Sequence, residues 1–290
     1  MQKYSIFNLI KNAFSGHQNW DLAWKDPTPK KEYDVVIIGG GGHGLATAYY
    51  LAKEHNITNV AIIEKGWIGG GNVGRNTTII RSNYMHDDNA LFSEFGMDLW
   101  RRMSQDLNYN VMFSPRGIIN LAHSDAQMNV FARRGNSMRL NGIDAVLLNR
   151  EEVKEIIPMA DFSDNVRFPI FGGLMQPSAG TARHDAVAWG YARQADSMGV
   201  DIIQNCEVTG FDVVSGKIQG VRTSRGDIKV KKIGLCVAGS TNILAEKLNM
   251  TLPIETHLLQ ACVSEPVKPV LDRVVTFGAG HFYISQSDKG

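Results

Sequence analysis

The stretch that decides the fold is residues 34–44, DVVIIGGGGHG, in which a short strand runs directly into glycines. Its first five residues are rich in β-branched side chains, as a buried parallel strand requires. A second short apolar run, VAII, occupies residues 60–63. Between the two, a helical pattern runs through Leu45, Ala48, Tyr49 and Leu51. The sequence therefore predicts a βαβ unit with a right-handed crossover.

The glycines of this turn match a dinucleotide-binding fingerprint. Gly39 allows the tight turn out of the strand, Gly41 lets the backbone approach a pyrophosphate, and Gly44 lets the helix pack close to the strand. The N–H groups of the helix N-terminus would face the phosphates. Glu64 ends the second strand about 20 residues later, where an acid accepts hydrogen bonds from a ribose. This context favours a dinucleotide site over a glycine-rich turn without a ligand, but it does not separate FAD from NAD.

The composition is that of an ordinary globular protein. Its 290 residues are more than one core usually needs, so two joined domains are expected. The 30 Lys and Arg residues balance 29 Asp and Glu residues, which argues against a nucleic-acid or anionic-membrane partner. The most apolar stretch, residues 35–52, is interrupted by five glycines and predicts no membrane span. Three isolated cysteines, Cys206, Cys236 and Cys262, fit a reducing compartment, so we expect a cytoplasmic protein.

Helices are predicted at several places along the rest of the chain. Apolar and capping patterns favour helices over residues 125–140, 150–157 and 185–198. A further helix, with its apolar residues in the core, is predicted from the spacing of Leu91, Phe92, Phe95, Leu99 and Met103.

Short strands dominate the later part of the sequence. Residues 207–214, 217–223 and 227–231 are predicted to form an antiparallel meander with tight turns. A separate buried strand is predicted for residues 233–238. Residues 281–285 also have strand character, and a sheet of this kind would need something after it. We therefore expect that a C-terminal part is missing.

The N-terminal arm has an apolar segment of its own. Residues 4–14, YSIFNLIKNAF, are mildly amphipathic and lack the cleavage site of a secretory signal. The segment could be a short helix that docks on a partner, or a surface arm of the same chain, and the sequence leaves both interpretations open.

Two later segments decide which dinucleotide the turn binds. They are GNVGRNTTIIRSNY at residues 71–84 and GTARHDAVAW at residues 180–189. With the fingerprint, they make the chain resemble the beta subunits of heterotetrameric sarcosine oxidases, which belong to the D-amino-acid-oxidase-like flavoenzymes. The resemblance extends from the N-terminal arm to Gly290. Subunits of that family are longer, and their C-terminal part completes the FAD domain.

The resemblance implies an α/β fold, in which a Rossmann-type FAD-binding domain with a β-meander is interleaved with an α+β substrate domain. After the arm, residues 1–33, the FAD-binding domain would comprise residues 34–110 and 181–252. The substrate domain would comprise residues 111–180 and 253–290, the second part being truncated.

The resemblance also implies two flavins. FAD would bind noncovalently, with its ADP half on Gly39, Gly41, Gly42, Gly44, Glu64 and Lys65. The loop that begins at Asn72 and ends at Arg81, and that contains Ile79, would lie along the flavin. A second flavin, FMN, would be bonded covalently to His184.

The implied reaction is the oxidation of sarcosine, N-methylglycine. Its products would be glycine, hydrogen peroxide, and formaldehyde or its folate adduct. Electrons would pass from the substrate C–N bond to FAD, then to FMN and finally to oxygen. An alpha subunit with NAD and a folate-handling domain, through which tetrahydrofolate would act, and small gamma and delta subunits would complete the complex.

Several side chains near the expected flavins have chemistry of their own. A neutral His184 imidazole can act as a nucleophile toward a flavin methyl group, and Arg183 could stabilise negative charge or be a solvated surface arginine. Arg75 and Arg81 are six residues apart across a run with strand character, so alternation would place both on one face. Such a face would stabilise a reduced flavin and a substrate carboxylate. The alternative is that both are structural arginines on the domain surface. The candidate catalytic residues are Arg75, Thr78 and Arg81.

Thr78 and four further positions are weaker candidates for cofactor contact. Thr77 and Thr78 could hydrogen-bond the flavin or simply suit a strand. In the related flavoproteins the backbone near Val208 meets adenine, and Gly239 would lie close to the same cofactor, although either residue could serve a turn. His43 would contact the cofactor through its backbone. No general base is identified by spacing.

Two rival functions remain open on the sequence alone. The chain could be a single-flavin oxidase or dehydrogenase of another small amine, such as dimethylglycine, glycine or proline. It could also be a noncatalytic assembly subunit of the same fold. The intact fingerprint, together with Glu64 and His184, counts against the second rival.

Overall fold

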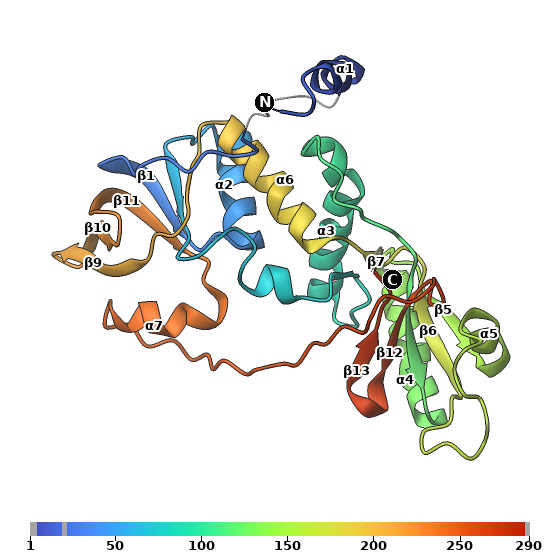
Figure 1. Ribbon diagram of the computed structural model, residues 1–290. Helices are drawn as coiled ribbons and strands as arrows, with labels where there is room; N and C mark the ends of the chain where they lie inside the picture. Colours follow the sequence, from blue (N-terminus) through green and yellow to red (C-terminus); the bar gives the residue numbers. More distant parts are fainter. Residues whose placement is uncertain (1–4, 19–21, 288–290) are drawn as a thin grey trace. The chain divides into compact units, whose positions relative to one another are not determined.

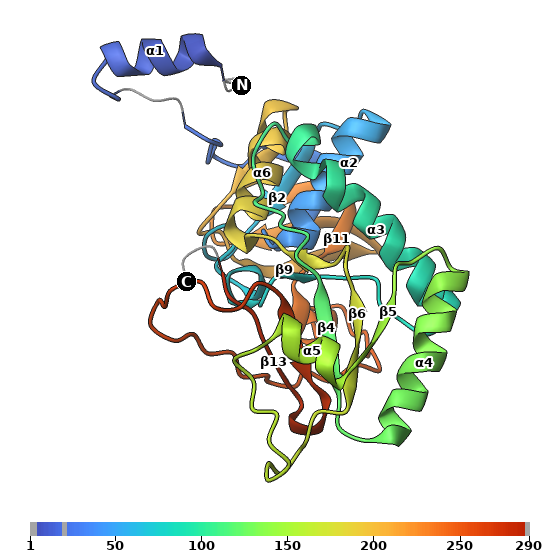
Figure 2. The same ribbon diagram turned by 90° about the vertical axis from the view of Figure 1, so that its right-hand side faces the viewer.

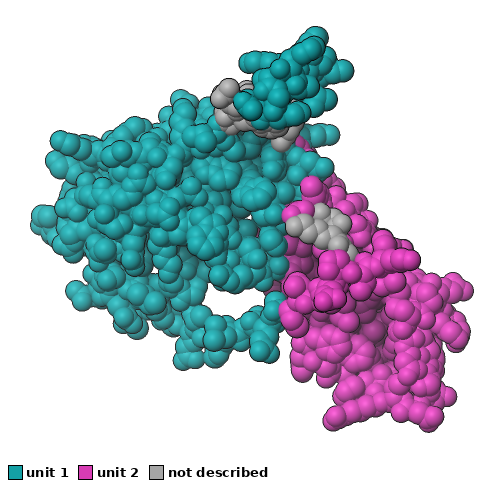
Figure 3. All heavy atoms as spheres, viewed as in Figure 1, with its two compact units in different colours: residues 1–76, 105–111, 184–261 teal, residues 77–104, 112–183, 262–290 magenta. Residues whose placement is uncertain are grey.

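Three stretches of sequence interleave with three others to form two units in the computed structural model, which describes residues 5–18 and 22–287 (Figure 3). The stretches are 1–76, 105–111 and 184–261 for unit 1, and 77–104, 112–183 and 262–290 for unit 2. The residue bounds predicted for the FAD-binding and substrate domains stay predictions.

Unit 1 is built on a six-stranded sheet in the order β8-β2-β1-β11-β10-β9 (Figure 1). Strands β8, β2, β1 and β11 pair in parallel, whereas β11, β10 and β9 pair antiparallel. This arrangement confirms the predicted Rossmann-type unit and its meander. The strands are β1 Glu32–Ile38, β2 Val60–Ile63, β8 Asp201–Ile203, β9 Val208–Val214, β10 Lys217–Thr223 and β11 Ile228–Leu235.

One continuous strand replaces two that the sequence predicted. Residues 227–231 and 233–238 were expected to be separate, but β11 runs unbroken from Ile228 to Leu235. It pairs with β1 from the Glu32–Lys229 partners to the Ile38–Leu235 partners, and its beginning also pairs with β10. Two exposed residues in succession, Lys231 and Lys232, interrupt the alternation. The pairing with β1 holds the strand together across that interruption.

The helices of unit 1 include α2, Gly42–His55, and α6, His184–Ser197, which lie side by side (Figure 1). The ring centroids of Tyr49 and Tyr191 are 5.4 Å apart between them. The shorter elements are α1 Ile6–Phe14, α7 Thr241–Glu246, and the 3-10 turns η1 Asn72–Arg75 and η2 Ala238–Ser240.

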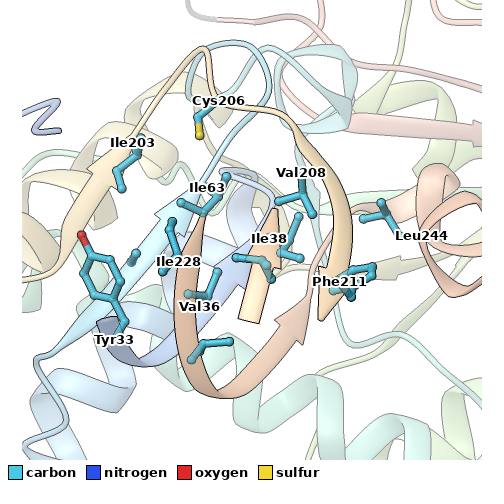
Figure 4. Packing of buried hydrophobic residues seen from close by; sticks show 13 residues of the cluster. Tyr33, Val36, Ile38, Ile63, Ile203, Cys206, Val208, Phe211, Ile228 and Leu244 are labelled. Carbon is cyan, nitrogen blue, oxygen red and sulfur yellow. The ribbon is translucent and has the colours of Figure 1, made fainter. Parts of the chain in front are cut away.

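The parallel strands and the meander share one apolar core. Figure 4 shows Val36, Ile38 and Ile63 from β1 and β2 gathered with Val208 and Phe211 from β9. All are almost fully buried. Since the meander is continuous with the parallel sheet through β11, both parts are held in one packing unit.

Unit 2 contains a five-stranded sheet in the order β13-β12-β4-β6-β5, and Figure 2 shows β4, β6 and β5 side by side. A two-stranded sheet joins β3, Ile79–Ile80, to β7, Gly180–Thr181. The strands of the large sheet are β4 Ile118–Ala122, β5 Val146–Asn149, β6 Gly172–Gln176, β12 Val274–Phe277 and β13 Phe282–Ile284. Its helices are α3 Asp87–Asp106, whose last two residues fall in unit 1, α4 Asp125–Leu140 and α5 Arg150–Ile156, with the 3-10 turn η3 Gly278–Gly280.

The inward face of α3 is not the one that the sequence predicted. Leu91, Phe92 and Phe95 were expected in the core, but they are 54%, 79% and 62% exposed. The helix buries Ala90 and Met97 instead, and of the predicted stripe Met103 is buried. The small residue Ala90 lies on the buried face, and the spacing of large hydrophobic residues alone does not identify that face. None of the helices in the described residues is long and apolar enough to cross a membrane.

Candidate functional site

The glycine turn at the end of β1 is geometrically restricted to glycine at two positions. Gly39 has φ +107°, and a Cβ placed on it would lie 2.3 Å from the backbone oxygen of Cys236. A Cβ on Gly44 would lie 2.0 Å from the backbone oxygen of Gly39. The first glycine therefore permits the turn and the last permits close packing of α2 on β1, as predicted.

At Gly41 and Gly42, the N-terminus of α2 has free space beside the backbone. Gly41 is the N-cap residue and makes no side-chain cap, and the first turn carries no acidic residue. A Cβ on Gly41 or Gly42 would meet only Cγ2 of Val73, at 3.7 Å and 3.4 Å respectively. The N–H groups of this turn and the helix dipole can therefore receive an anion such as a pyrophosphate.

Glu64 is held against the same turn. Its Oε2 accepts a hydrogen bond from the Gly40 N–H at 2.8 Å, and its Oε1 accepts one from the Gly66 N–H at 2.8 Å. A carboxylate has about four acceptor positions, so two stay available for other donors. Ribose hydroxyls are donors of the required kind, and the position is the one that the fingerprint predicts.

The loop after β2 folds back over the glycine turn. The Gly69 N–H donates to the Gly40 oxygen at 3.4 Å, and the Gly74 N–H donates to the Gly69 oxygen at 2.9 Å. Within this loop Asn72 and Arg75 are exposed, and the Arg75 guanidinium donates to the backbone oxygen of Gly70. Lys65, before the loop, is exposed as well.

The expectation that strand alternation aligns Arg75 with Arg81 is wrong. Arg75 ends the 3-10 turn η1, and only Ile79 and Ile80 between the two arginines are in a strand. Thr78 has φ +59°, which interrupts any extended run. The two arginines also belong to different units.

His184 opens helix α6 within unit 1. One turn later, Ala188 faces the loop after β2, where a Cβ on Gly69 would lie 3.8 Å from the Ala188 Cβ. The His184 Nδ1 is buried and has no hydrogen-bond partner among the described residues. A buried nitrogen without a partner is costly, so this imidazole is suited to a group that the protein itself does not supply. Arg183, the preceding residue, is half-buried and falls in unit 2.

The last part of the predicted flavin loop, residues 77–81, lies in unit 2 and is paired with β7. Ile79 pairs with Thr181, and the Thr78 oxygen accepts from the Ala182 N–H at 3.2 Å. A positive φ is unusual for a β-branched residue, so the Thr78 conformation is a strained feature.

Arg81 is part of a pair of cations that converge on Asn83. Its Nη1 donates to Asn83 Oδ1 at 2.6 Å, and its guanidinium carbon lies 4.9 Å from the centre of the Tyr84 ring. Arg134 donates through Nε to the backbone oxygen of Asn83 at 2.7 Å. Burial, together with the charge of Arg81, lowers the pKa of Arg134. Neither guanidinium has a carboxylate partner within the part of the chain that the structure describes. The pair can therefore attract an anionic group.

Sequence reasoning missed the polar support beneath this pair. Ser82 is fully buried, and its N–H donates to Gln176 Oε1 at 3.0 Å while its hydroxyl donates to Glu94 Oε2 at 2.6 Å. On the other side of the loop, Thr77 donates to the Tyr283 hydroxyl at 2.7 Å. The only sequence signal was the polar pair Ser82 and Asn83, which follows Arg81 shortly after the apolar residues Ile79 and Ile80.

Three weaker candidates have clear structural roles. Val208 opens β9 in the core and is 6% exposed. Gly239 lies in η2, where a Cβ would come within 2.9 Å of Thr256 Cγ2. The His43 side chain is exposed, and its backbone oxygen accepts from Thr47 Oγ1 at 2.7 Å. For each of the three, contact with the cofactor stays a prediction.

Similarity to known proteins agrees with these features. The family model of the FAD dependent oxidoreductases (DAO) matches residues 34–290. The sarcosine oxidase subunit beta of Rhizobium meliloti (strain 1021) is 60% identical over 288 residues, covering 99% of this chain and 69% of its own. That of Rhodobacter capsulatus is 52% identical over 290 residues, covering 100% and 70%.

Among solved structures, L-proline dehydrogenase from P. horikoshii aligns with a TM-score of 0.78 and 25% identity, covering 90% of this chain and 69% of that one. The fingerprint at Gly39–Gly44, the acid at Glu64 and these similarities agree in what they imply. The chain belongs to the FAD-dependent oxidoreductase family of the D-amino-acid-oxidase type, and within it to the group of the sarcosine oxidase beta subunits.

Proposed function

We propose that this chain is the catalytic beta subunit of a multisubunit sarcosine oxidase. The substrate is N-methylglycine, and the products are glycine, hydrogen peroxide, and formaldehyde or its folate adduct. The observation that carries the proposal is the pair of Arg81 and Arg134, which have no carboxylate partner among the described residues, in a chain whose relatives at 52–60% identity are sarcosine oxidase beta subunits.

FAD fits the residues of unit 1. The open amides at Gly41 and Gly42 would hold the pyrophosphate, and Glu64, already oriented by two backbone N–H groups, would accept the ribose hydroxyls. Lys65, Asn72 and the backbone near Val208 and Gly239 are proposed as further contacts. When bound, FAD would supply an acceptor for two electrons from the substrate C–N bond, and FMN would supply the reaction of those electrons with oxygen.

The substrate carboxylate would bind at Arg81. Its guanidinium is held in place by the Asn83 amide and the Tyr84 ring, and the neighbouring Arg134 adds positive charge. Thr77, Thr78 and Ile79 of unit 2, and separately Arg75 of unit 1, are proposed as flavin contacts. Because the amine needs only to be held neutral and close to the flavin, positioning is the main task of these residues.

The test of this proposal is the kinetics of Arg81→Gln in the assembled enzyme. Removing a charge-assisted contact to the carboxylate should lower kcat/KM for sarcosine by on the order of a hundredfold, mostly through KM. Arg133→Gln, a change of a neighbouring arginine outside this pair, serves as the control. Unchanged kcat/KM in Arg81→Gln would remove the carboxylate from this position.

FMN is proposed to be bonded to His184, whose buried Nδ1 lacks a protein partner among the described residues, with Arg183 beside it to stabilise negative charge. His184→Ala should abolish covalent flavin while FAD still binds. Peptide mass analysis of the acid-precipitated complex measures both, because covalent FMN stays with the pellet and FAD is released. Covalent flavin that survives the substitution would overturn the attachment.

The complex would contain alpha, gamma and delta subunits, with tetrahydrofolate acting through the alpha subunit. A second candidate function is the oxidation of another small amine, such as proline, dimethylglycine or glycine, and the match to L-proline dehydrogenase over 90% of this chain favours keeping it. Comparing kcat/KM across these amines and sarcosine separates the two candidates. A purified complex that contains no flavin would instead indicate a noncatalytic subunit.

A further inference from the structure

Helix α1 presents a continuous apolar face near the N-terminus. Ser5 caps it by accepting a hydrogen bond from the Asn8 N–H at 3.2 Å. At 100° per residue, Ile6, Leu9, Ile10 and Ala13 share one side, and Phe7 and Phe14 extend that side around the helix. Its polar residues, Asn8, Lys11 and Asn12, lie together on the opposite side.

The apolar face of α1 is exposed. The exposed fractions of its large side chains are 67% for Ile6, 79% for Phe7, 64% for Leu9, 47% for Ile10 and 89% for Phe14. On the polar side, Lys11 is exposed as well, and Asn8 and Asn12 are half-buried. A helix that packs on its own chain buries its apolar face, whereas here that face is exposed.

A helix this short needs packing to be stable. The nine residues of α1 are fewer than the ~12–15 that an isolated helix requires in water. No residue of α1 is buried, so the described part of the chain does not supply the packing. The stabilising surface has to come from elsewhere.

The kind of surface follows from charge and from the family comparison. Helices that lie on membranes carry many Lys and Arg residues on their polar side, whereas Lys11 is the one charged residue of α1. The family model begins at residue 34 and leaves the arm outside the flavin-binding fold. The two beta subunits that align over 99% and 100% of this chain nevertheless include the arm. The arm thus accompanies proteins that are named as subunits.

We propose that α1 inserts its apolar face into a groove on a different subunit of the same enzyme complex. The groove would be lined by aliphatic and aromatic side chains, as in other complexes where an amphipathic helix lies in a groove. The proposal rests on the proposed function only in that a complex of several different subunits exists.

Photocrosslinking identifies directly which molecule contacts α1. Benzoylphenylalanine replaces Phe7 on the apolar side, or Lys11 on the polar side as the control, in the full-length chain assembled with its subunits. The expected result is a crosslink from position 7 to another subunit, identified by peptide mass analysis, and a much weaker one from position 11. A crosslink to this same chain, to a second copy of it or to lipid, or no crosslink at all, would overturn the proposal.

A pair of matched substitutions measures the contribution of the apolar side. Ile10→Glu should weaken subunit association by about tenfold or more, because a charge would enter the apolar interface. Asn12→Glu adds the same charge two residues away on the polar side and should leave association within about twofold of the unsubstituted protein. Native mass spectrometry over a dilution series reports both. Equal effects of the two variants would contradict the proposed interface.

The same preparations keep the two proposals apart. FAD content should be unchanged in Ile10→Glu, because the arm lies outside the FAD-dependent oxidoreductase match. If the complex oxidises proline rather than sarcosine but still loses a subunit in Ile10→Glu, the proposed substrate fails and the role of α1 stands. If sarcosine turnover is found and Ile10→Glu assembles normally, the role of α1 fails alone.

Discussion

The absence of a side chain at Gly44 allows α2 to pack closely on β1. A Cβ there would lie 2.0 Å from the Gly39 backbone oxygen, so Gly44→Ala must push α2 away from β1. We expect this variant to lose FAD and to unfold at a lower temperature, by several degrees, even as apoprotein. The measurements are the flavin absorbance after gel filtration and the Tm of the apoprotein.

Gly41→Ala is the matched comparison for that prediction. Its Cβ would meet only Val73 Cγ2 at 3.7 Å, so the apoprotein should keep its Tm. The added methyl group would still stand where a pyrophosphate approaches, and FAD affinity should fall. If both alanine variants bind FAD like the unsubstituted protein, the turn is not a phosphate site.

Tyr33 predicts how stability depends on alkaline pH. Its ring is fully buried, its hydroxyl donates to Asp201 Oδ2 at 2.8 Å and accepts from the Lys30 N–H at 3.0 Å, and burial raises its pKa above the ordinary 10.0. Because the folded pKa is the higher one, the neutral phenol contributes its full stability below about pH 10 and loses it as the pH rises further. Tyr33→Phe should cost about 1–2 kcal/mol at pH 8 and flatten the alkaline loss. Urea midpoints at pH 8 to 11 would show this, and parallel curves for the two proteins would refute it.

At the scale of elements, strand continuity and helix facing depend on partners. β11 stays one strand across Lys231 and Lys232 because β1 pairs with it on both sides of Lys231, at Lys229 and Val230 and again from Lys232 to Leu235. Local signals fix other boundaries well: α5 begins where Asn149 and Glu152 form a reciprocal capping box, and the predicted start at residue 150 is correct. Capping is a property of adjacent residues, whereas pairing joins residues about two hundred positions apart.

At the scale of the whole molecule, a long exposed connection leads to the last strands. Leu258 and Leu259 are 97% and 94% exposed, so brief chymotrypsin treatment of the native chain should cut there first. The released end should stay bound, because Val274–Phe277 pairs with Ile118–Leu121 inside unit 2. Gel filtration followed by denaturing electrophoresis tests both statements. Separation of the fragments would mean that this pairing is too weak to hold them, and a slower cut in a Leu258→Ser, Leu259→Ser variant would verify the site.

The sequence by itself determined the βαβ unit, the meander and the dinucleotide turn. Apolar strands, glycine positions such as Gly39 and Gly44, and the spacing to Glu64 are local patterns, and each constrains the backbone directly. The family segments added His184 and Arg81 as candidates, and their chemical roles stay predictions.

Only the tertiary structure decided which residues meet. It replaced the expected alignment of Arg75 and Arg81 with the pairing of Arg81 and Arg134 around Asn83, and it turned Leu91, Phe92 and Phe95 of α3 outward. Arg134 is 53 positions after Arg81 and lies on helix α4, whereas Arg81 is in the loop after β3, so no periodicity relates the two. Which side chains converge, and which side of a helix is buried, depend on packing between elements that are distant in the sequence. A local pattern carries no information about the element that packs against it.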